Sequence, residues 1–149
     1  MKKPAKSKKT TPVINLNYNK VESKLFVEKG VESIEIDGTI LRREYICDNN
    51  DNDIYLTVAT MGNVELGSSE YKLGDEWHTI NDDEKQTLGT NNELDGKKLK
   101  ISRSVSGEVG ASCTVSVWIE GGYRDMVYRL SSEVGANNSV TFVIYVEFI

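Results

Sequence analysis

Hydrophobic residues in this chain alternate with polar ones at a period of two, and this pattern constrains the fold more than any other feature. Along 140–148 the apolar positions include Val140, Phe142, Ile144, Val146 and Phe148. Successive side chains of a β-strand point to opposite faces, so this alternation is typical of a strand that buries one face. Similar sets occur at 54–58, 99–101, 115–119 and 126–130. The chain is therefore predicted to be all-β.

Turn residues separate these strands at short, regular intervals. Asp37-Gly38, Asp95-Gly96 and Gly121-Gly122 lie between apolar alternations, and such pairs favour tight connections. We expect a two-residue hairpin at Asp37-Gly38, a single helical turn at most within 82–88, and a central or well-covered position for the last strand. The spacing predicts about nine or ten strands. This number is typical of a single antiparallel β-sandwich with Greek-key, jelly-roll or C2-like connections.

Charge divides the chain into two parts. Residues 1–12 contain both prolines and no acidic residue, and their five lysines are Lys2, Lys3, Lys6, Lys8 and Lys9. This segment has nothing to bury, so we expect a disordered basic tail at 1–12 and a sandwich domain at 13–149. The other 137 residues hold 13 basic and 23 acidic side chains, a formal charge of −10. Such an acidic body disfavours nucleic-acid binding.

The amino-acid sequence shows neither a targeting signal nor the cysteine pattern of a disulfide framework. Asparagines interrupt the apolar residues that follow the lysine run, so the start of the chain does not match a signal peptide. No apolar run is long enough to span a bilayer. Cys47 and Cys113 can form at most one bridge, and a chain of 149 residues does not need it. The predicted location is the cytoplasm.

No motif of a known enzyme chemistry is present. The chain has no phosphate-binding glycine loop, no Cys-x-x-Cys pair and no Gly-x-Ser-x-Gly sequence. His78 is its one histidine, and therefore the one imidazole available to activate a serine or cysteine nucleophile. We interpret His78 as a surface or rim residue. The chain is predicted not to be an enzyme.

The segment 47–53 is the best metal candidate. Asp48, Asp51 and Asp53 supply carboxylates there, with asparagines between them, and oxygen ligands at alternate positions suit calcium. The glycine and the bidentate glutamate that complete an EF-hand loop are absent. Turns rich in Asp and Asn also form for conformational reasons alone. No cofactor is predicted, and calcium stays as an alternative.

Aromatic side chains offer a carbohydrate-binding alternative. Trp77 and Trp118, with Tyr71 and Tyr123, are able to provide stacking surfaces on a sandwich. The stronger interpretation is structural: Trp118 belongs to a strand and covers the core or a sheet, and Trp77 precedes an acidic loop at the sandwich edge.

An internal repeat marks two connections. Residues 106–117 and 131–142 share six identities in twelve positions at an offset of 25, including Glu-Val-Gly-Ala. Strand reversal predicts that both connections lie at one end of the domain. Two similar turns explain the repeat most simply. The alternative is a binding rim, and we predict Glu108, Glu133 and Trp77 as its residues.

These observations favour a non-catalytic protein-binding or assembly module that acts through its loops and its lysine tail. Its expected partner is another protein or a second copy of itself, and sequence-specific nucleic-acid binding is not expected. A second hypothesis is a membrane-acting or toxin-system protein, because a small acidic sandwich without enzyme motifs fits that class. The lysine tail is also suited to an anionic lipid surface. A calcium- or carbohydrate-binding module is the third.

Overall fold

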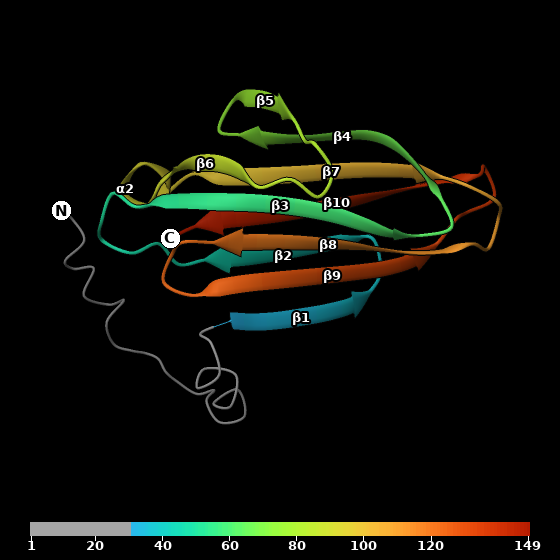
Figure 1. Ribbon diagram of the computed structural model, residues 1–149, viewed down its shortest axis with the longest axis horizontal. Helices are drawn as coiled ribbons and strands as arrows, with labels where there is room; N and C mark the ends of the chain where they lie inside the picture. The colour runs from blue at the N-terminus through green and yellow to red at the C-terminus, as the bar shows by residue number, and fades with distance from the viewer. Residues whose placement is uncertain (1–30) are drawn as a thin grey trace.

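The computed structural model describes residues 31–149, which form two β-sheets packed face to face (Figure 1). The ten strands of this part are β1 (Val31–Asp37), β2 (Ile40–Tyr45), β3 (Asp53–Gly62), β4 (Glu65–Leu73), β5 (Glu76–Thr79), β6 (Gln86–Thr90), β7 (Lys98–Ser106), β8 (Ser112–Glu120), β9 (Asp125–Glu133) and β10 (Ser139–Phe148). The strand order is β1-β9-β8-β3-β6 in the first sheet and β2-β10-β7-β4-β5 in the second. The all-β prediction is confirmed. The predicted tail at 1–12 and the first part of the predicted domain, 13–30, lie outside the described residues.

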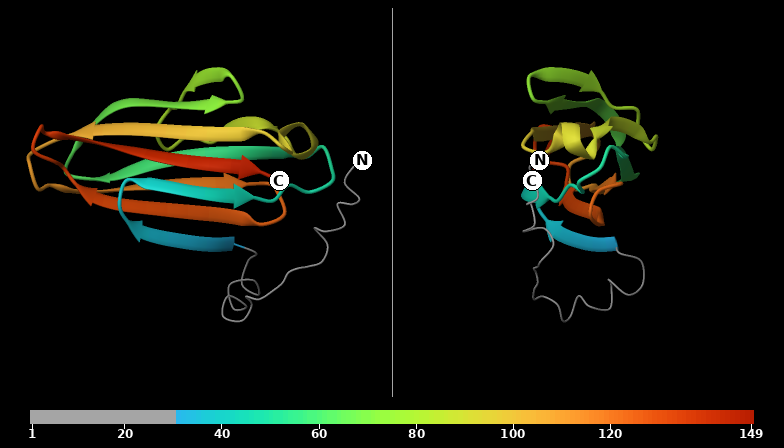
Figure 2. Two further views of the ribbon diagram at one scale, coloured as in Figure 1. Left: turned by 180° about the vertical axis from the view of Figure 1, so that it is seen from behind. Right: turned by 90° about the vertical axis from the view of Figure 1, so that its left-hand side faces the viewer.

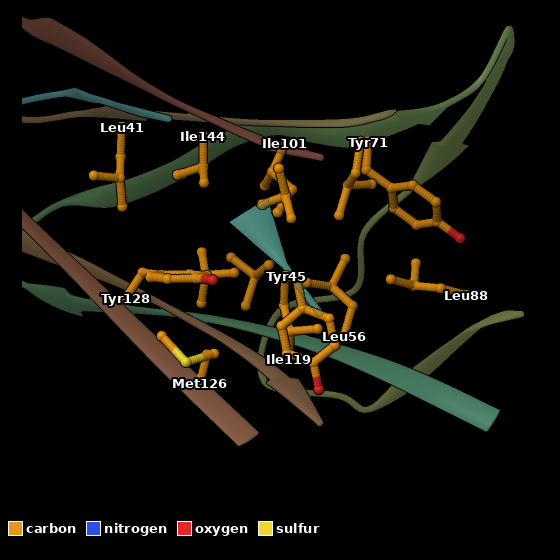
Figure 3. Close-up of a cluster of buried hydrophobic side chains, with 14 of the residues drawn as sticks. Leu41, Tyr45, Leu56, Tyr71, Leu88, Ile101, Ile119, Met126, Tyr128 and Ile144 are labelled. Carbon is orange, nitrogen blue, oxygen red and sulfur yellow. The ribbon is translucent and has the colours of Figure 1, made fainter. Parts of the chain in front are cut away.

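The core lies between the two sheets, where the period-two alternation places it. Figure 3 shows side chains of the first sheet, such as Leu56 and Ile119, pointing toward Ile101 and Ile144 of the second. All four are fully buried. Strand β10 lies between β2 and β7, as expected for a central strand, and its inward positions are Phe142, Ile144, Val146 and Phe148.

The expectation of a purely antiparallel sandwich is wrong, because each sheet is mixed. Strand β1 pairs in parallel with β9, and β2 pairs in parallel with β10. Asp37-Gly38 is correspondingly not the turn of a hairpin, since the chain crosses there from one sheet to the other. Gly38 N–H donates to the Ser131 carbonyl of β9, and Val143 N–H of β10 donates to the Thr39 carbonyl. Strand β1 thus adds to the free edge of β9 in the first sheet, and β2 adds to the free edge of β10 in the second.

The helical turn forms later in the chain than expected. Residues 82–83 make a non-helical turn, whereas α2 (Asn91–Leu94) is the helix. A capping box begins it: Glu93 N–H donates to Thr90 Oγ1 at 3.1 Å, and Thr90 N–H donates to Glu93 Oε1 at 2.9 Å. Within residues 31–149, no helix has the length and apolar character needed to cross a membrane.

One cation interrupts the apolar interior. Arg103 of β7 points inward and is 2% exposed, and its guanidinium contacts the Asp82 carboxylate at 2.7 Å. Asp82 lies in the connection from β5 to β6, where Asp83 N–H donates to the Val58 carbonyl and Ile80 N–H donates to the Ser69 carbonyl. Burial lowers the pKa of Arg103, and Asp82 opposes this shift. The ion pair ties this connection to the second sheet, and the two backbone hydrogen bonds join it to both sheets.

We predict that Phe142→Ala lowers the free energy of unfolding by about 3–5 kcal/mol, because it leaves a cavity at a fully buried position. Val143→Ala on the outer face of the same strand should cost about 1 kcal/mol or less. Urea denaturation of both variants measures the difference. Equal losses would contradict the assigned register of β10.

A second prediction concerns the buried ion pair. Asp82→Ala should lower the free energy of unfolding by about 3–5 kcal/mol, since it leaves the Arg103 charge buried without its partner. Adding Arg103→Met to that variant should restore most of the loss, because the double variant has no buried charge. Urea denaturation is again the measurement, and a double variant as unstable as Asp82→Ala would show that the charge pair is not the cause.

Candidate functional site

Basic side chains gather on the outer face of the second sheet. A hollow of about 400 Å³ there is lined by five cations and an aromatic ring, and we call it the basic groove: Arg42, Arg43, Lys72, Lys98, Lys100 and Tyr145. Residues 31–149 contain 10 basic and 21 acidic side chains. Half of the basic residues of this acidic body therefore line a single hollow.

The same alternation that builds the core turns most of these side chains outward; Arg43 is the exception, because it shares the inward phase of β2 with buried Leu41 and Tyr45. In β10, Ile144 and Val146 are buried, so Tyr145 between them faces outward. In β7, buried Leu99 separates Lys98 from Lys100. Strand position then brings them together, because β2, β10, β7 and β4 are neighbours in the sheet.

The register aligns four of these side chains in one row across the sheet, and Trp77 of β5 continues the row. In strand order the row is Arg42, Tyr145, Lys100, Lys72 and Trp77. The Arg42 guanidinium lies 4.1 Å from the centre of the Tyr145 ring, and Lys100 Nζ lies 5.9 Å from it. Lys72 Nζ lies 5.6 Å from the Trp77 ring. The aromatic rings hold the cations by cation–π contacts and leave their charge unneutralised.

None of the five groove cations forms a salt bridge with a described residue. Elsewhere in the described part of the chain, Lys85, Arg103, Arg124 and Arg129 each have a carboxylate partner within 4.0 Å. Lys72 and Lys100 face each other directly across the strands, and like charges in that position destabilise a sheet. Glu147 is the only carboxylate that lines the hollow. This arrangement suits an external anion.

The two repeated connections lie together at the other end of the domain, as strand reversal predicts (Figure 1). Gly110 N–H donates to the Val134 carbonyl, and Val134 N–H donates to the Ala111 carbonyl. Their surroundings nevertheless differ: Val109 is 60% exposed, whereas its equivalent Val134 is 2% exposed. Glu108 and Glu133 are both exposed there. The repeated sequence thus occupies two unlike environments.

The third predicted rim residue, Trp77, lies at β5, away from Glu108 and Glu133 and beside the basic groove. The aromatic residues of the carbohydrate hypothesis are not brought together, since Trp118 faces outward from the first sheet and Tyr71 is buried. His78 stacks on Tyr71 with ring centres 4.7 Å apart. It is exposed, in line with the interpretation of a surface residue.

The acidic segment 47–53 is organised by hydrogen bonds. Asp48 N–H donates to Asn91 Oδ1, and Asn91 Nδ2 donates to the carbonyls of Asn52 and Gly121. Asp51 Oδ1 accepts from Asn92 Nδ2. Among residues 31–149, no three His, Cys, Asp or Glu side chains are grouped to hold a metal ion. Asn91, fully buried, shapes this segment.

Sequence reasoning missed the basic groove because its residues come from four separate strands. The sequence did contain one signal: Lys98 and Lys100 alternate with apolar residues in one strand, as Tyr145 and Glu147 do in another, so both pairs are expected to point outward. That these side chains lie together follows only from the order of the strands in the sheet, which the sequence does not reveal. No protein family matches the chain, and neither a curated protein nor a solved structure is significantly similar to it.

We predict that Lys100→Glu stabilises the fold, because it replaces a facing pair of like charges by an opposite pair with Lys72. The expected gain is about 0.5 kcal/mol, or roughly 1–2 °C in Tm, and it should shrink at high salt. Thermal unfolding in low and high salt measures it. Lys97→Glu, just before β7, is the control and should have no comparable effect. A destabilised Lys100→Glu protein would mean that the groove cations do not repel one another.

Proposed function

We propose that this chain is a non-catalytic binding module, and that its basic groove binds a short acidic segment of a protein partner. The observation that carries the proposal is the group of five cations without a carboxylate partner among the described residues, on a body with 10 basic and 21 acidic side chains. Cations with unsatisfied charge attract and orient an acidic partner.

The limited extent of the groove favours a short acidic segment over a long polyanion or an anionic membrane. The cations occupy one cross-strand row and its neighbourhood. Exposed Glu44 lies two residues from Arg42 on β2, and exposed Glu70 lies two residues from Lys72 on β4. A nucleic-acid strand or a lipid surface would extend over these carboxylates and be repelled. A peptide with a few carboxylates would contact the cations alone.

We propose a cytoplasmic location, supported by buried Cys47 and Cys113, which are not disulfide-bonded. We also propose Greek-key, jelly-roll or C2-like connections, binding without a cofactor and the absence of enzymatic activity. Binding through the lysine tail and through the rim of Glu108 and Glu133 remains a prediction. The basic groove is a third candidate binding surface.

The protein contains a suitable reporter for a binding experiment. Trp118→Phe leaves Trp77, next to the groove, as the only tryptophan. Titration with a hexaglutamate peptide should change Trp77 fluorescence, whereas hexaglutamine should not. Lys72→Gln with Lys100→Gln should weaken peptide binding about ten-fold, which corresponds to about 1.4 kcal/mol.

Lys85→Gln with Lys97→Gln is the matched control, since it removes the same charge outside the groove. The proposal is wrong if this control weakens the peptide as much as the groove variant does. It is also wrong if hexaglutamate does not bind. Binding to phosphatidylserine vesicles, with leakage of their contents and loss of both in the groove variant, would replace it by the membrane-acting hypothesis.

A further inference from the structure

Three connections form the end of the domain opposite α2, which we call the tip (Figure 2): 63–64, 107–111 and 134–138. Hydrogen bonds join two of them, since Gly107 N–H donates to the Asn138 carbonyl and Asn138 Nδ2 donates back to the Gly107 carbonyl at 3.1 Å. Gly107 also packs closely against Val64, where an added Cβ would lie 3.2 Å from the Val64 side chain. The three connections of the tip therefore hold one another in place and form one continuous surface.

Apolar side chains are exposed around the tip. Met61 at the end of β3 is 68% exposed, Leu66 at the start of β4 is 49% exposed, and Val109 projects from the connection 107–111. Burying such side chains in a contact supplies a favourable free energy that ion pairs at a surface do not. The tip thus has the apolar part of an interaction surface.

Carboxylates surround these apolar residues. Glu65, Glu108 and Glu133 are exposed at the tip, and none of them forms a salt bridge with a residue of 31–149. A surface that combines apolar and acidic residues fits a partner that combines apolar and basic ones.

The basic groove has that combination. Beside the row that contains Arg42 and Tyr145, the next row of the outer face contains Ile40 and Val143, which are register partners. Ile40 is exposed, and Trp77 adds a second exposed apolar group at the other end of the groove. Cations and apolar side chains therefore lie beside one another on this face, as carboxylates and apolar side chains do at the tip.

We infer that the occupant of the basic groove is the tip of a second copy of this chain. This inference rests on the proposed function and names its partner. Glutamates of one copy would contact the groove cations of the next, while Met61, Leu66 and Val109 would pack near Ile40 and Trp77. Other acidic segments offer less: Asp82, in the acidic connection 81–84, is already paired with the buried Arg103.

The location of the two surfaces determines the kind of assembly. The tip lies where β7 ends and β10 begins, whereas the groove lies where β7 begins and β10 ends. Two different surfaces at opposite ends make a head-to-tail contact, which leaves one tip and one groove free after every addition. The protein should therefore form chains whose mass grows with concentration.

Complementary variants test this inference. Lys72→Gln with Lys100→Gln removes charge from the groove and retains the tip, and Glu108→Gln with Glu133→Gln does the reverse. Analytical ultracentrifugation should show growing assemblies for the unmodified protein and at least ten-fold weaker association for each variant alone. An equimolar mixture should associate and stop at a dimer, at twice the chain mass of 16.7 kDa, because only one functional tip and one functional groove meet.

Asp53→Gln with Glu84→Gln is the matched control for removed acidic charge away from the tip, and it should assemble like the unmodified protein. A mixture of the groove and tip variants that remains monomeric overturns the inference. So does assembly that is lost on deletion of residues 1–12, because the lysine segment would then be the occupant. A monomeric unmodified protein that still binds hexaglutamate overturns the self-association and leaves the proposed function intact.

Discussion

The registered pairing of β7 with β10 is the constraint on which the rest of the structure depends. These two strands form the centre of the second sheet, and their inward residues, such as Ile101 and Ile144, lie opposite each other in the core. The same register places Lys100 beside Tyr145 on the outer face. A slip of one residue would exchange the two faces, exposing isoleucines and burying lysines. The core and the basic groove are thus two results of one pairing.

Cations in the described part of the protein have two different roles. Arg103 is buried and tied to Asp82, so its charge serves the fold. Lys72 and Lys100 are half-buried and face each other on the outer side of the sheet, where their repulsion opposes folding. Natural proteins commonly retain such unfavourable groups where function requires them. The described part of the protein thus holds a buried cation whose charge is neutralised, and a facing pair of lysines whose repulsion the fold tolerates.

The local sequence pattern predicted the strands, but features that depend on the order of the strands in the sheets could not be predicted from it. The alternation through Phe142 and Phe148 identified β10 and its buried face because that information lies within one segment. Asp37-Gly38 signalled a tight connection, yet a dipeptide does not specify whether its two strands join one sheet or two. The basic groove escaped prediction for the same reason, since Arg42 and Tyr145 are separated along the chain and become neighbours only through the parallel pairing of β2 with β10. Arg103 occupies an inward position that the pattern assigns to an apolar residue.

The parallel pairing of the first two described strands has a consequence for how the chain folds. Val31 of β1 is aligned with Asp125 of β9, and Ile40 of β2 with Val143 of β10. Strands β1 and β2 therefore cannot pair until β9 and β10 have been synthesised. The entropy cost of closing the loops between such distant segments must be met before the contacts form, and this slows folding. Until they form, the edges of β9 and β10 stay open to pairing with other chains. During synthesis, the last strands to emerge therefore decide when the earliest ones are protected from aggregation.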